Sequence, residues 1–316
     1  MGTAQPETSS TTSMGVAITT YETRDLLREC LASARAEAPP EVVVVDNAST
    51  DGTAEMVRRE FPEVRLEVNS ENRGNGPACN QAVALCRSPY VLLLNSDTRL
   101  EPGTLQRLAR YLDANPRAAV AGPRLANPDG SLQASCFPFI GTFRMSIEKS
   151  AAGRLLARVP AVRERWLLSH GAHDRPRRVP WLLGAALALR REAFDAVGGF
   201  DPVFFMYTEE VDLCWRLHAA GWEVHFAPVT TVVHVGGAST RRARAAMAVR
   251  RVQGARLFYR RHYSPVRVAV LEGLIRAAML VRLGRDRLRL GWTRESPARE
   301  RLAEDVSVWR GALKRG

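Results

Sequence analysis

Strand and helix signals alternate along the first half of this 316-residue chain. Short β-branched runs such as 42–45 are typical of strands buried on both faces, and amphipathic segments such as 24–34 are typical of the helices that cover them. This alternation predicts an α/β fold in which helices cover both faces of a parallel sheet. The expected strands are 15–20, 42–45, 64–68, 90–94, 118–122, 223–226 and 230–235, and the expected helices are 24–34, 51–61, 77–86 and 102–115.

The pattern loosens over 137–178, where Pro, Gly, Arg and isolated aromatic residues follow no clean period. A long irregular segment of this kind is often a lid or a binding loop, so we expect a mobile excursion here. Residues 1–13 are polar and are expected to be a disordered tail. From 241 to 316 the chain is Arg-rich and is expected to be helical to its end.

The net charge of +12 is concentrated in the C-terminal segment. Residues 241–316 contain 19 Arg and one Lys against six acidic residues, a net charge of +14, so the body of the chain is close to neutral. Arg-rich helices with an apolar face suit an anionic membrane surface, and a solvated Arg-rich extension is the alternative. A nucleic-acid-binding protein would also be basic, but the sequence contains no recognised nucleic-acid module.

Signals for the cellular compartment favour the cytoplasm. The five cysteines are odd in number and form no CxxC pair, which predicts reduced thiols without disulfides or a zinc site. No secretory signal peptide is visible. The longest apolar run, 266–281, is interrupted by Arg267, Glu272 and Arg276, so we do not expect it to cross a membrane. It could lie on a membrane surface instead.

Polar residues follow the first two expected strands. Open α/β sheets bind ligands at the carboxyl ends of their strands, which makes these positions candidates for a site. The first strand runs into Thr20 and Tyr21, and the second into Asp46 and Asn47. Asp46 is placed to accept a hydrogen bond from the imide N–H of uracil or thymine, whereas residues 49–51 have the simpler alternative of capping the next helix.

A glycine-rich turn over 72–76 precedes the helix that carries Asn80. Glycines here, Gly74 among them, would let the backbone approach a ligand and would aim the start of the helix at a diphosphate. The NxGxG pattern also makes an ordinary turn, and that alternative stays open.

Asn95, Ser96 and Asp97 come directly after a buried strand. An acid at this position could hold a divalent cation between two phosphates, because Mg²⁺ or Mn²⁺ takes one or two protein carboxylates and leaves its other positions to phosphate and water. An Asx-turn is the alternative. His234 ends a late strand among valines, where it is either a core residue or a second metal ligand.

Three carboxylates, Glu209, Glu210 and Asp212, begin a helix that is otherwise apolar in pattern. Acids in a first turn complement the helix dipole, and after an aromatic loop they also suit a general base in a partly dry cleft. On a helix Glu209, Asp212 and Arg216 share one face, which predicts an ion-pair cluster and leaves Glu210 pointing elsewhere.

Six motifs follow one another in a characteristic order: DNASTDGT, NRGNGPACNQA, LLLNSD, WLLGAALALRREAFDAVGGFD, FFMYTEEVDLCWR and VHVGG. Through them residues 14–240 resemble the family 2 glycosyltransferases, in particular the rhamnosyltransferase-type members. The resemblance implies a GT-A fold, a Rossmann-like nucleotide-diphospho-sugar transferase domain whose mixed, mostly parallel sheet is flanked by helices. It also implies an inverting reaction. The resemblance is loose over 137–178, which is expected to be an acceptor-side loop region, and after 241, where the composition predicts a basic helical extension suited to a membrane surface.

The resemblance further implies a role for each candidate residue. Asp97 and His234 would bind Mg²⁺ or Mn²⁺, although Asn95 stands where the family has the first acid of its DxD motif, which predicts a modest metal affinity. The pair Glu209–Glu210 matches a Glu-Asp pair whose second acid is the usual base, so Glu210 is the first candidate, with Glu209 and Asp212 as alternatives. The nucleotide pocket would include Thr20, Tyr21, Asp46, Asn47, Gly74, Asn80, Asn95 and Ser96, and the sugar and acceptor site Trp181, Gly184 and Ala185.

The expected activity is therefore an inverting sugar transfer in cell-wall or surface polysaccharide synthesis. Rhamnose from dTDP-rhamnose is the first candidate for the sugar, and a saccharide or polyprenyl-linked molecule is the expected acceptor. A UDP-sugar or GDP-mannose is the alternative donor, and a non-catalytic nucleotide-sugar-binding protein is the alternative of another class. We expect the enzyme in the cytoplasm, attached to the inner face of the plasma membrane.

Overall fold

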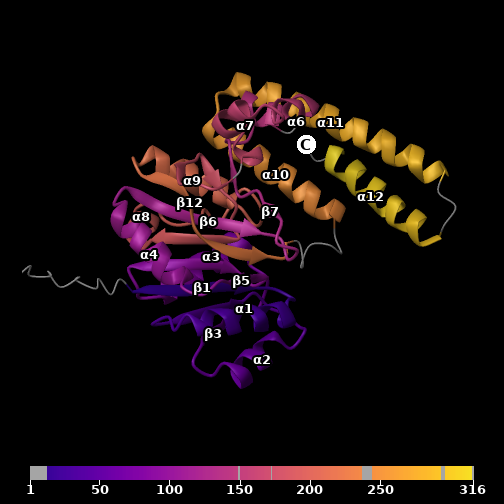
Figure 1. Ribbon diagram of the computed structural model, residues 1–316. Coiled ribbons are helices and arrows are strands. Elements are labelled where there is room, and N and C mark those ends of the chain that lie inside the picture. The colour runs from indigo at the N-terminus through magenta and orange to yellow at the C-terminus, as the bar shows by residue number, and fades with distance from the viewer. Residues whose placement is uncertain (1–12, 149, 172, 237–243, 293–295, 315–316) are drawn as a thin grey trace, which may run out of the picture.

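The structure is a computed structural model that describes residues 13–148, 150–171, 173–236, 244–292 and 296–314 (Figure 1). Its strands are β1 (Met14–Thr20), β2 (Val42–Asp46), β3 (Arg65–Val68), β4 (Tyr90–Asn95), β5 (Thr98–Leu100), β6 (Ala118–Ala126), β7 (Leu132–Gln133), β8 (Cys136–Phe137), β9 (Arg177–Arg178), β10 (Trp181–Leu182), β11 (Ala186–Arg190) and β12 (Glu223–His234). Its helices are α1 (Arg24–Ala36), α2 (Thr53–Glu60), α3 (Asn75–Leu85), α4 (Thr104–Ala114), α5 (Phe143–Glu148), α6 (Ala151–Leu156), α7 (Pro160–Trp166), α8 (Arg191–Ala196), α9 (Glu209–Ala219), α10 (Arg244–His262), α11 (Pro265–Trp292) and α12 (Ser296–Lys314), with a 3-10 turn η1 (Leu168–His170).

One sheet forms the centre of the molecule, in the order β3-β2-β1-β4-β11-β6-β12-β5. Strand β7 pairs with β6 and β9 with β12, while β8 and β10 form a separate two-stranded ribbon. All neighbours from β3 to β4 are parallel, and β11 then runs antiparallel to both β4 and β6. The sheet is therefore mixed and, by paired residues, mostly parallel, as expected.

The register brings several strand ends to one edge of the sheet. Thr20 lies opposite Asp46, and the neighbouring Thr19 lies opposite Asn95. Strand β12 is parallel to β6 and ends at His234. The carboxyl ends of β1, β2, β4 and β12 and the amino end of β11 consequently share this edge, which is the usual ligand side of an open α/β sheet.

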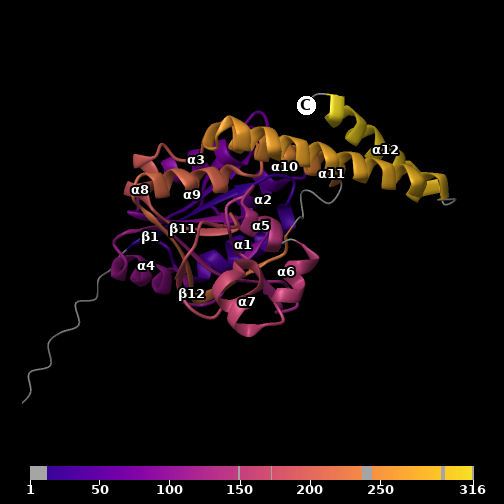
Figure 2. The same cartoon turned by 90° about the horizontal axis from the view of Figure 1, so that it is seen from above.

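Two hydrophobic layers hold the helices to the sheet. Helices α3, α8 and α9 cover one face, and α1, α2 and α4 cover the other (Figure 2). Alternate residues of β1 show the division, because Ala17 packs in the layer that includes Leu213 of α9, whereas Ile18 packs in the layer that includes Leu108 of α4. Helices are needed on both faces because both faces of these strands are apolar.

Each strand and helix expected in the first half is present, with ends that differ by a few residues, and the acidic helix is α9. Strand β5 was not expected, since it is only three residues long. The strands expected at 223–226 and 230–235 are a single strand, β12, whose pairing with β6 shifts between Phe226 and Thr231. An irregularity of this kind disturbs the local pattern without ending the strand.

The expectation of an irregular 137–178 was wrong for its secondary structure. The segment contains α5, α6, α7 and η1, each of seven residues or fewer, and helices that short show too few turns for a period to be detected. A buried carboxylate, Glu148, fastens them: it accepts hydrogen bonds from the backbone N–H groups of Leu168 and Ser169 and from the Ser169 hydroxyl. Mobility and an acceptor-side role for this segment remain predictions.

The expected C-terminal helices are present as α10, α11 and α12. Phe258 and Tyr259 of α10 are buried in the same layer as α9, and α10, α11 and α12 share a smaller cluster that includes Met279 and Trp309. The main core thus extends past residue 240, and the domain limits stay predictions. The tail expected at 1–13 falls, except for Ser13, outside the described residues.

The five cysteines are free and buried, and burial raises the pKa of each thiol to about 12. They are therefore protonated, inert side chains of the core. Among the helices that the structure describes, none combines the length and apolar character that a membrane crossing requires.

Candidate active site

Asp46 ends β2 with a side chain that is fully buried. Its Oδ1 atom accepts a hydrogen bond from the Ser49 N–H at 3.0 Å, while Oδ2 is buried without a partner among the described residues. Burial raises the pKa of this carboxyl group. A buried acceptor without a donor is uncommon in native proteins, so Oδ2 is a natural place for an N–H group of a ligand.

The side chains of residues 49–51 do not occupy the N-cap position of α2, which is Gly52 in a left-handed conformation. They stabilise the surrounding loops instead. Ser49 accepts from the Glu22 N–H. Asp51 accepts from the N–H groups of Arg24 and Thr53, and so joins the starts of α1 and α2.

Asn47 organises the loop after β3. Its amide nitrogen donates to Asn72 Oδ1 and to the Gly74 carbonyl, and its Oδ1 accepts from the Arg73 N–H and from Asn69 Nδ2. With four hydrogen bonds the side chain is fully used within the protein. A nucleotide contact by Asn47 remains a prediction.

Gly74 and Asn80 hold the loop that leads into α9. Gly74 has φ +91°, and a Cβ atom there would lie 2.3 Å from the Phe205 carbonyl oxygen, so only glycine fits. Asn80 donates to the Phe200 carbonyl and accepts from the Phe200 N–H. Both residues thus meet this loop, and their expected contact with a nucleotide is not tested by the geometry.

Thr20 and Ser96 are joined through a third hydroxyl. The Thr23 hydroxyl lies 2.9 Å from that of Thr20 and 2.7 Å from that of Ser96. All three are buried, so the chain of hydroxyl groups fixes the ends of β1 and β4 against each other. Tyr21 extends from the same turn and is 41% exposed, which leaves its ring available at the surface of the site.

Asp97 and His234 meet at the sheet edge. Asp97 Oδ1 lies 3.3 Å from His234 Nε2, and Asp97 Oδ2 accepts from the Gly236 N–H. His234 Nδ1 lies 2.6 Å from Oε1 of Gln133, whose amide nitrogen donates to Asn127. Nδ1 is thus engaged by Gln133, and Nε2 faces the Asp97 carboxylate.

The residues expected in the sugar and acceptor site lie around β10 and β11. The Ala185 carbonyl accepts from the Asn95 N–H, which places this turn beside the end of β4. Gly184 lies next to Glu210, because a Cβ atom on it would be 3.7 Å from the Glu210 Cβ atom. Trp181 is buried, donates to the Pro138 carbonyl and stacks on Phe137, so its indole N–H is already used.

The helix α9 begins after two consecutive non-glycine residues in the left-handed region, Tyr207 (φ 66°) and Thr208 (φ 77°). Such a conformation costs free energy and concentrates at functional sites. Glu209, the first helical residue, is buried and accepts a hydrogen bond from Asn75 Nδ2 at 2.7 Å. Burial raises the pKa of Glu209, and the hydrogen bond opposes this effect.

Glu210 follows Glu209 in the first turn of α9. Its Oε2 atom is buried and has no hydrogen-bond partner within the described part of the chain. Burial, together with the charge of Glu209, raises its pKa from the ordinary 4.5 to about 8. A carboxyl group with a pKa near neutrality, with one oxygen left without a hydrogen bond in the described residues and lying beside Gly184, has the properties of a general base.

Asp212 has a structural role, so it is removed from the candidates for the base. It is buried, its Oδ2 accepts from Arg216 Nε at 2.7 Å, and its Oδ1 lies 2.7 Å from His262 Nε2. The predicted ion pair with Arg216 is confirmed. The prediction that Glu209 belongs to that cluster was wrong, because Glu209 turns to Asn75 instead.

Helix α10 packs against the loop before α9. Arg250 lies over the Phe205 ring at 4.2 Å, and Arg251 lies over the Tyr207 ring at 4.7 Å. A Cβ atom on Gly254 would be 2.8 Å from both the Tyr207 carbonyl and the Thr208 hydroxyl oxygen. The C-terminal helices thus reach the residues that aim Glu210.

Sequence reasoning missed Asn75, Gln133, Gly254 and His262, which support the site from a distance. Asn75 lies within the NRGNGPACNQA motif, and its polar side chain at the start of a helix is a signal that could have identified it. Gln133, Gly254 and His262 carry no local signal, because their partners lie 46 to 101 positions away in the sequence.

The sequence matches the description Glycosyl transferase family 2 over residues 15–198. Over 245 residues it is 34% identical to the N-acetylglucosaminyl-diphospho-decaprenol L-rhamnosyltransferase of Mycobacterium tuberculosis (strain ATCC 25618 / H37Rv), with 72% of this chain and 77% of the relative covered. A 56-residue stretch is 41% identical to Rhamnosyltransferase WbbL of Escherichia coli (strain K12), covering 18% of this chain and 21% of that protein.

Solved structures show the same fold. The mannosyltransferase PcManGT from Pyrobaculum calidifontis, in complex with GDP-Man and Mn²⁺, is similar with a TM-score of 0.53 at 20% identity, over 95% of this chain and 83% of that one. The match to the family covers more than half of the sequence, and the 245-residue alignment shows similarity to a rhamnosyltransferase. The chain therefore belongs to glycosyltransferase family 2, a family of enzymes with the GT-A fold.

Proposed function

We propose that this protein transfers L-rhamnose from dTDP-rhamnose to a saccharide or polyprenyl-linked acceptor, with inversion at the anomeric carbon. The observation that carries the proposal is Glu210, a carboxyl group of raised pKa beside Gly184 whose Oε2 has no hydrogen-bond partner among the described residues. The choice of rhamnose is supported by the similarity to the mycobacterial rhamnosyltransferase. The buried, unpaired oxygen of Asp46 supports a base with an imide N–H, such as thymine or uracil.

A divalent cation fits the pair Asp97 and His234. The imidazole Nε2 lies 3.3 Å from a carboxylate oxygen, a spacing that two ligands of one cation can have, and its other nitrogen contacts Gln133, as is usual behind metal-bound histidines. One imidazole and one carboxylate suit Mn²⁺ better than Mg²⁺, which prefers oxygen. No group of three or more such ligands occurs among the described residues, so phosphate and water would complete the coordination.

The chain's own residues supply the rest of the reaction. Glu210 would take the proton from an acceptor hydroxyl, whose oxygen forms the new bond to the anomeric carbon as the bond to the nucleotide diphosphate breaks. Attack from the face opposite the leaving group inverts the configuration and needs no enzyme nucleophile. Asn75 donates a hydrogen bond to Glu209 and so fixes the acid next to Glu210. A bound metal ion would supply positive charge beside the departing diphosphate.

The acceptor we propose is a lipid-linked saccharide, which a cytoplasmic enzyme would meet at the inner face of the plasma membrane. The support is the name of the mycobacterial relative, which specifies a diphospho-decaprenol acceptor. A role in cell-wall or surface polysaccharide synthesis is part of this proposal, and the lipid-linked saccharide in that name supports it.

The donor assignment can be tested by the thermal stability of the purified protein with dTDP, UDP and GDP, each with and without Mn²⁺. A ligand at about 100 times its dissociation constant adds roughly 2.7 kcal/mol to the free energy of unfolding. We expect the largest shift for dTDP with Mn²⁺. A larger shift with UDP or GDP would show that the donor carries that nucleotide and not dTDP. No shift with any nucleotide would contradict the assignment of the site.

A further inference from the structure

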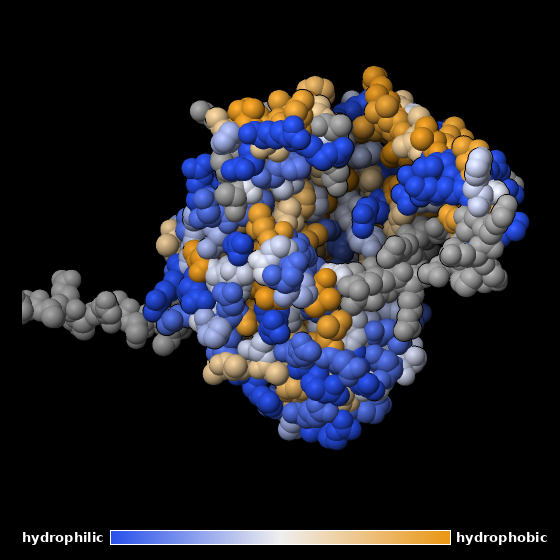
Figure 3. All heavy atoms as spheres, turned by 45° about the vertical axis from the view of Figure 1, so that its right-hand side comes forward, coloured by the Kyte–Doolittle hydropathy of each residue, from blue (hydrophilic) through white to orange (hydrophobic). Residues whose placement is uncertain are grey.

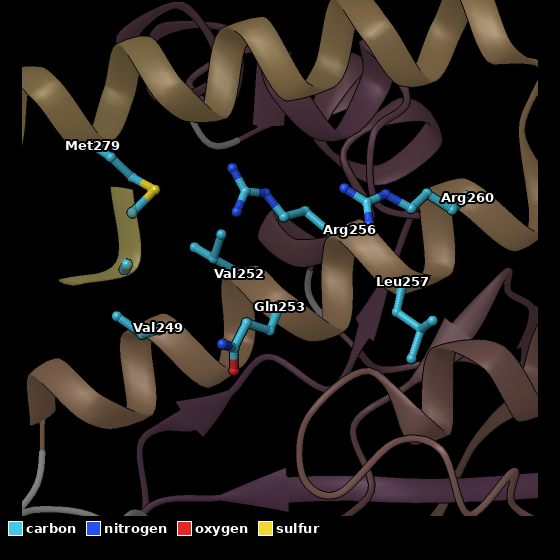
Figure 4. Close-up of a pocket in the computed structure, with 8 residues that line it drawn as sticks. Val249, Val252, Gln253, Arg256, Leu257, Arg260 and Met279 are labelled. Carbon is cyan, nitrogen blue, oxygen red and sulfur yellow. The ribbon is translucent and has the colours of Figure 1, made fainter. Parts of the chain in front are cut away.

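Helix α11 is apolar on two opposite faces. Its inner face packs through Met279 and Leu283 against α10 and α12, and through Leu271 and Ile275 against the main core. Figure 4 shows the inner surface, where a pocket between the three helices is lined by Met279 and by Arg256 and other residues of α10. The inner apolar side chains are thus accounted for by contacts within the protein.

The outer face of α11 is largely exposed among the described residues. Seven of its large apolar side chains are between 58% and 86% exposed: Val266, Val270, Leu274, Leu280, Val281, Leu288 and Trp292. At 3.6 residues per turn they fall within about a third of the helix circumference. Every other residue in that sector is Gly or Ala, and the glycines, Gly273, Gly284 and Gly291, face open space. We call this sector the outer stripe.

The outer stripe is visible as a continuous apolar area. Figure 3 shows hydrophobic surface along the upper right of the molecule, where α11 lies. A helix of 28 residues is roughly 42 Å long, so the stripe is far more extended than a single exposed leucine. Contiguous apolar surface of this kind marks an interaction site.

Arginines border the outer stripe on both sides. At 100° per residue Arg276 and Arg287 lie along one border and Arg267 and Arg285 along the other. The acids of the helix, Glu272 and Asp286, lie on its inner half, where Asp286 pairs with Arg285. Glu272 pairs with Arg256 and Arg260 of α10, and Asp286 is buried. An apolar sector bordered by cations and free of acids matches a surface that is apolar inside and anionic outside.

We propose that the outer stripe of α11 docks into the headgroup layer of an anionic bilayer, with the helix parallel to the membrane plane. The apolar side chains enter the boundary of the acyl chains, and the bordering arginines meet lipid phosphates. A second copy of the chain fits less well, because two such faces would bring arginine borders together. The proposal deepens the proposed function, because it names the surface that holds the enzyme at the membrane, and it does not depend on the donor sugar.

Co-sedimentation of the full-length protein with vesicles tests this docking face. The vesicles are phosphatidylcholine alone or mixed with phosphatidylglycerol, at low and high salt. The test variant is Leu274→Glu/Val281→Glu, at two exposed positions of the stripe. The control, Arg58→Gln/Arg110→Gln, changes the net charge by the same amount in α2 and α4, which lie away from α11 (Figure 1).

We expect the wild type and the control to bind anionic vesicles, more weakly at high salt, and the test variant to bind at least tenfold more weakly. Unchanged binding by the test variant, or no binding by the wild type, would overturn the proposal. Self-association of the wild type that the variant abolishes, without vesicle binding, would assign the stripe to a second copy instead. Leu274→Ser/Val281→Ser repeats the test if the acidic variant loses its thermal transition, and nucleotide stabilisation, measured in parallel, reports separately on the donor site.

Discussion

At the scale of single residues, three neighbouring carboxylates have three different roles. Asp212 is held by Arg216 and His262, Glu209 accepts a hydrogen bond from Asn75, and Glu210 lies beside Gly184 with its pKa raised to about 8. Their spacing on a helix predicted part of this division, because Asp212 and Arg216 are one turn apart. The rest could not be predicted, since His262 and Asn75 come from helices 50 and 134 positions away.

Replacing Glu210 by Gln should stabilise the fold and abolish turnover. The folded protein holds this proton up to about pH 8, whereas the unfolded chain releases it near 4.5, so wild-type stability falls as the pH rises between these values. At pH 8 the free energy of unfolding of Glu210→Gln should exceed that of the wild type by at least about 1 kcal/mol, since one pKa unit corresponds to roughly 1.4 kcal/mol. Below pH 4.5 the two proteins should be equally stable in thermal unfolding.

The same ionisation should govern activity. For the wild type, kcat/KM should rise with pH to an apparent pKa well above 4.5, and Glu209→Gln should move that limb to lower pH because it removes a neighbouring charge. Turnover of Glu210→Gln should drop by orders of magnitude. Near-wild-type turnover in that variant would remove Glu210 from the mechanism.

The proposed metal site makes a separate prediction for Gln133. Gln133→Leu removes the acceptor that fixes His234 Nδ1, and loss of such a partner typically costs 10- to 100-fold in metal affinity. A Mn²⁺ titration followed by calorimetry should show this loss, with Asp97→Ala showing no binding. Gln106→Leu on the exposed side of α4 is the control and should bind as wild type does. Equal affinity in all four proteins would contradict the assignment of Asp97 and His234.

At the scale of elements, prediction from the sequence was most accurate where the periodic segments are long. The β-branched runs and amphipathic helices up to residue 122 are present nearly as expected, because each element buries a full apolar face. The helices of 137–178 are too short for that, and their order depends on Glu148, whose hydrogen bonds reach residues 20 positions away. Helix α10 is a different case: it was expected as a helix, but its contact with the α9 loop has no local signal.

Gly254 packs α10 closely against the loop before α9, so Gly254→Ala should lower activity. The added methyl group would meet the Tyr207 carbonyl and the Thr208 hydroxyl at 2.8 Å, which displaces the two strained residues before Glu209 and Glu210. We expect kcat to fall at least tenfold, about 1.4 kcal/mol in the barrier, and nucleotide binding to persist.

Gly273→Ala is a matched control in α11, where a Cβ atom would meet no atom within 4 Å. A helix gains up to about 1 kcal/mol from this change when nothing clashes. Gly273→Ala should therefore raise the melting temperature and leave kcat unchanged. If Gly254→Ala behaves in the same way, α10 does not position the loop.

At the scale of the whole molecule, the C-terminal helices α10, α11 and α12 pack against the rest of the enzyme and also present the outer stripe of α11. The sequence located its charge and its helices correctly, and composition alone suggested an extension after residue 240. Composition could not reveal that Phe258 is buried in the core beneath α9 or that His262 reaches Asp212. Such contacts depend on how three helices fold back onto the sheet.

Two truncations distinguish an appendage from an integral part. A chain that ends at residue 241 loses Phe258, and removal of a buried Phe side chain alone typically costs 3–5 kcal/mol, a large part of the roughly 5–15 kcal/mol that holds a domain folded. It also leaves Asp212 without His262. A chain that ends at residue 295 loses only α12, whose buried residues belong to the smaller cluster with α10 and α11. We expect the longer chain to keep its nucleotide-dependent thermal shift and the shorter one to unfold or aggregate; a shorter chain that still binds nucleotide with wild-type affinity would show that the core closes without α10.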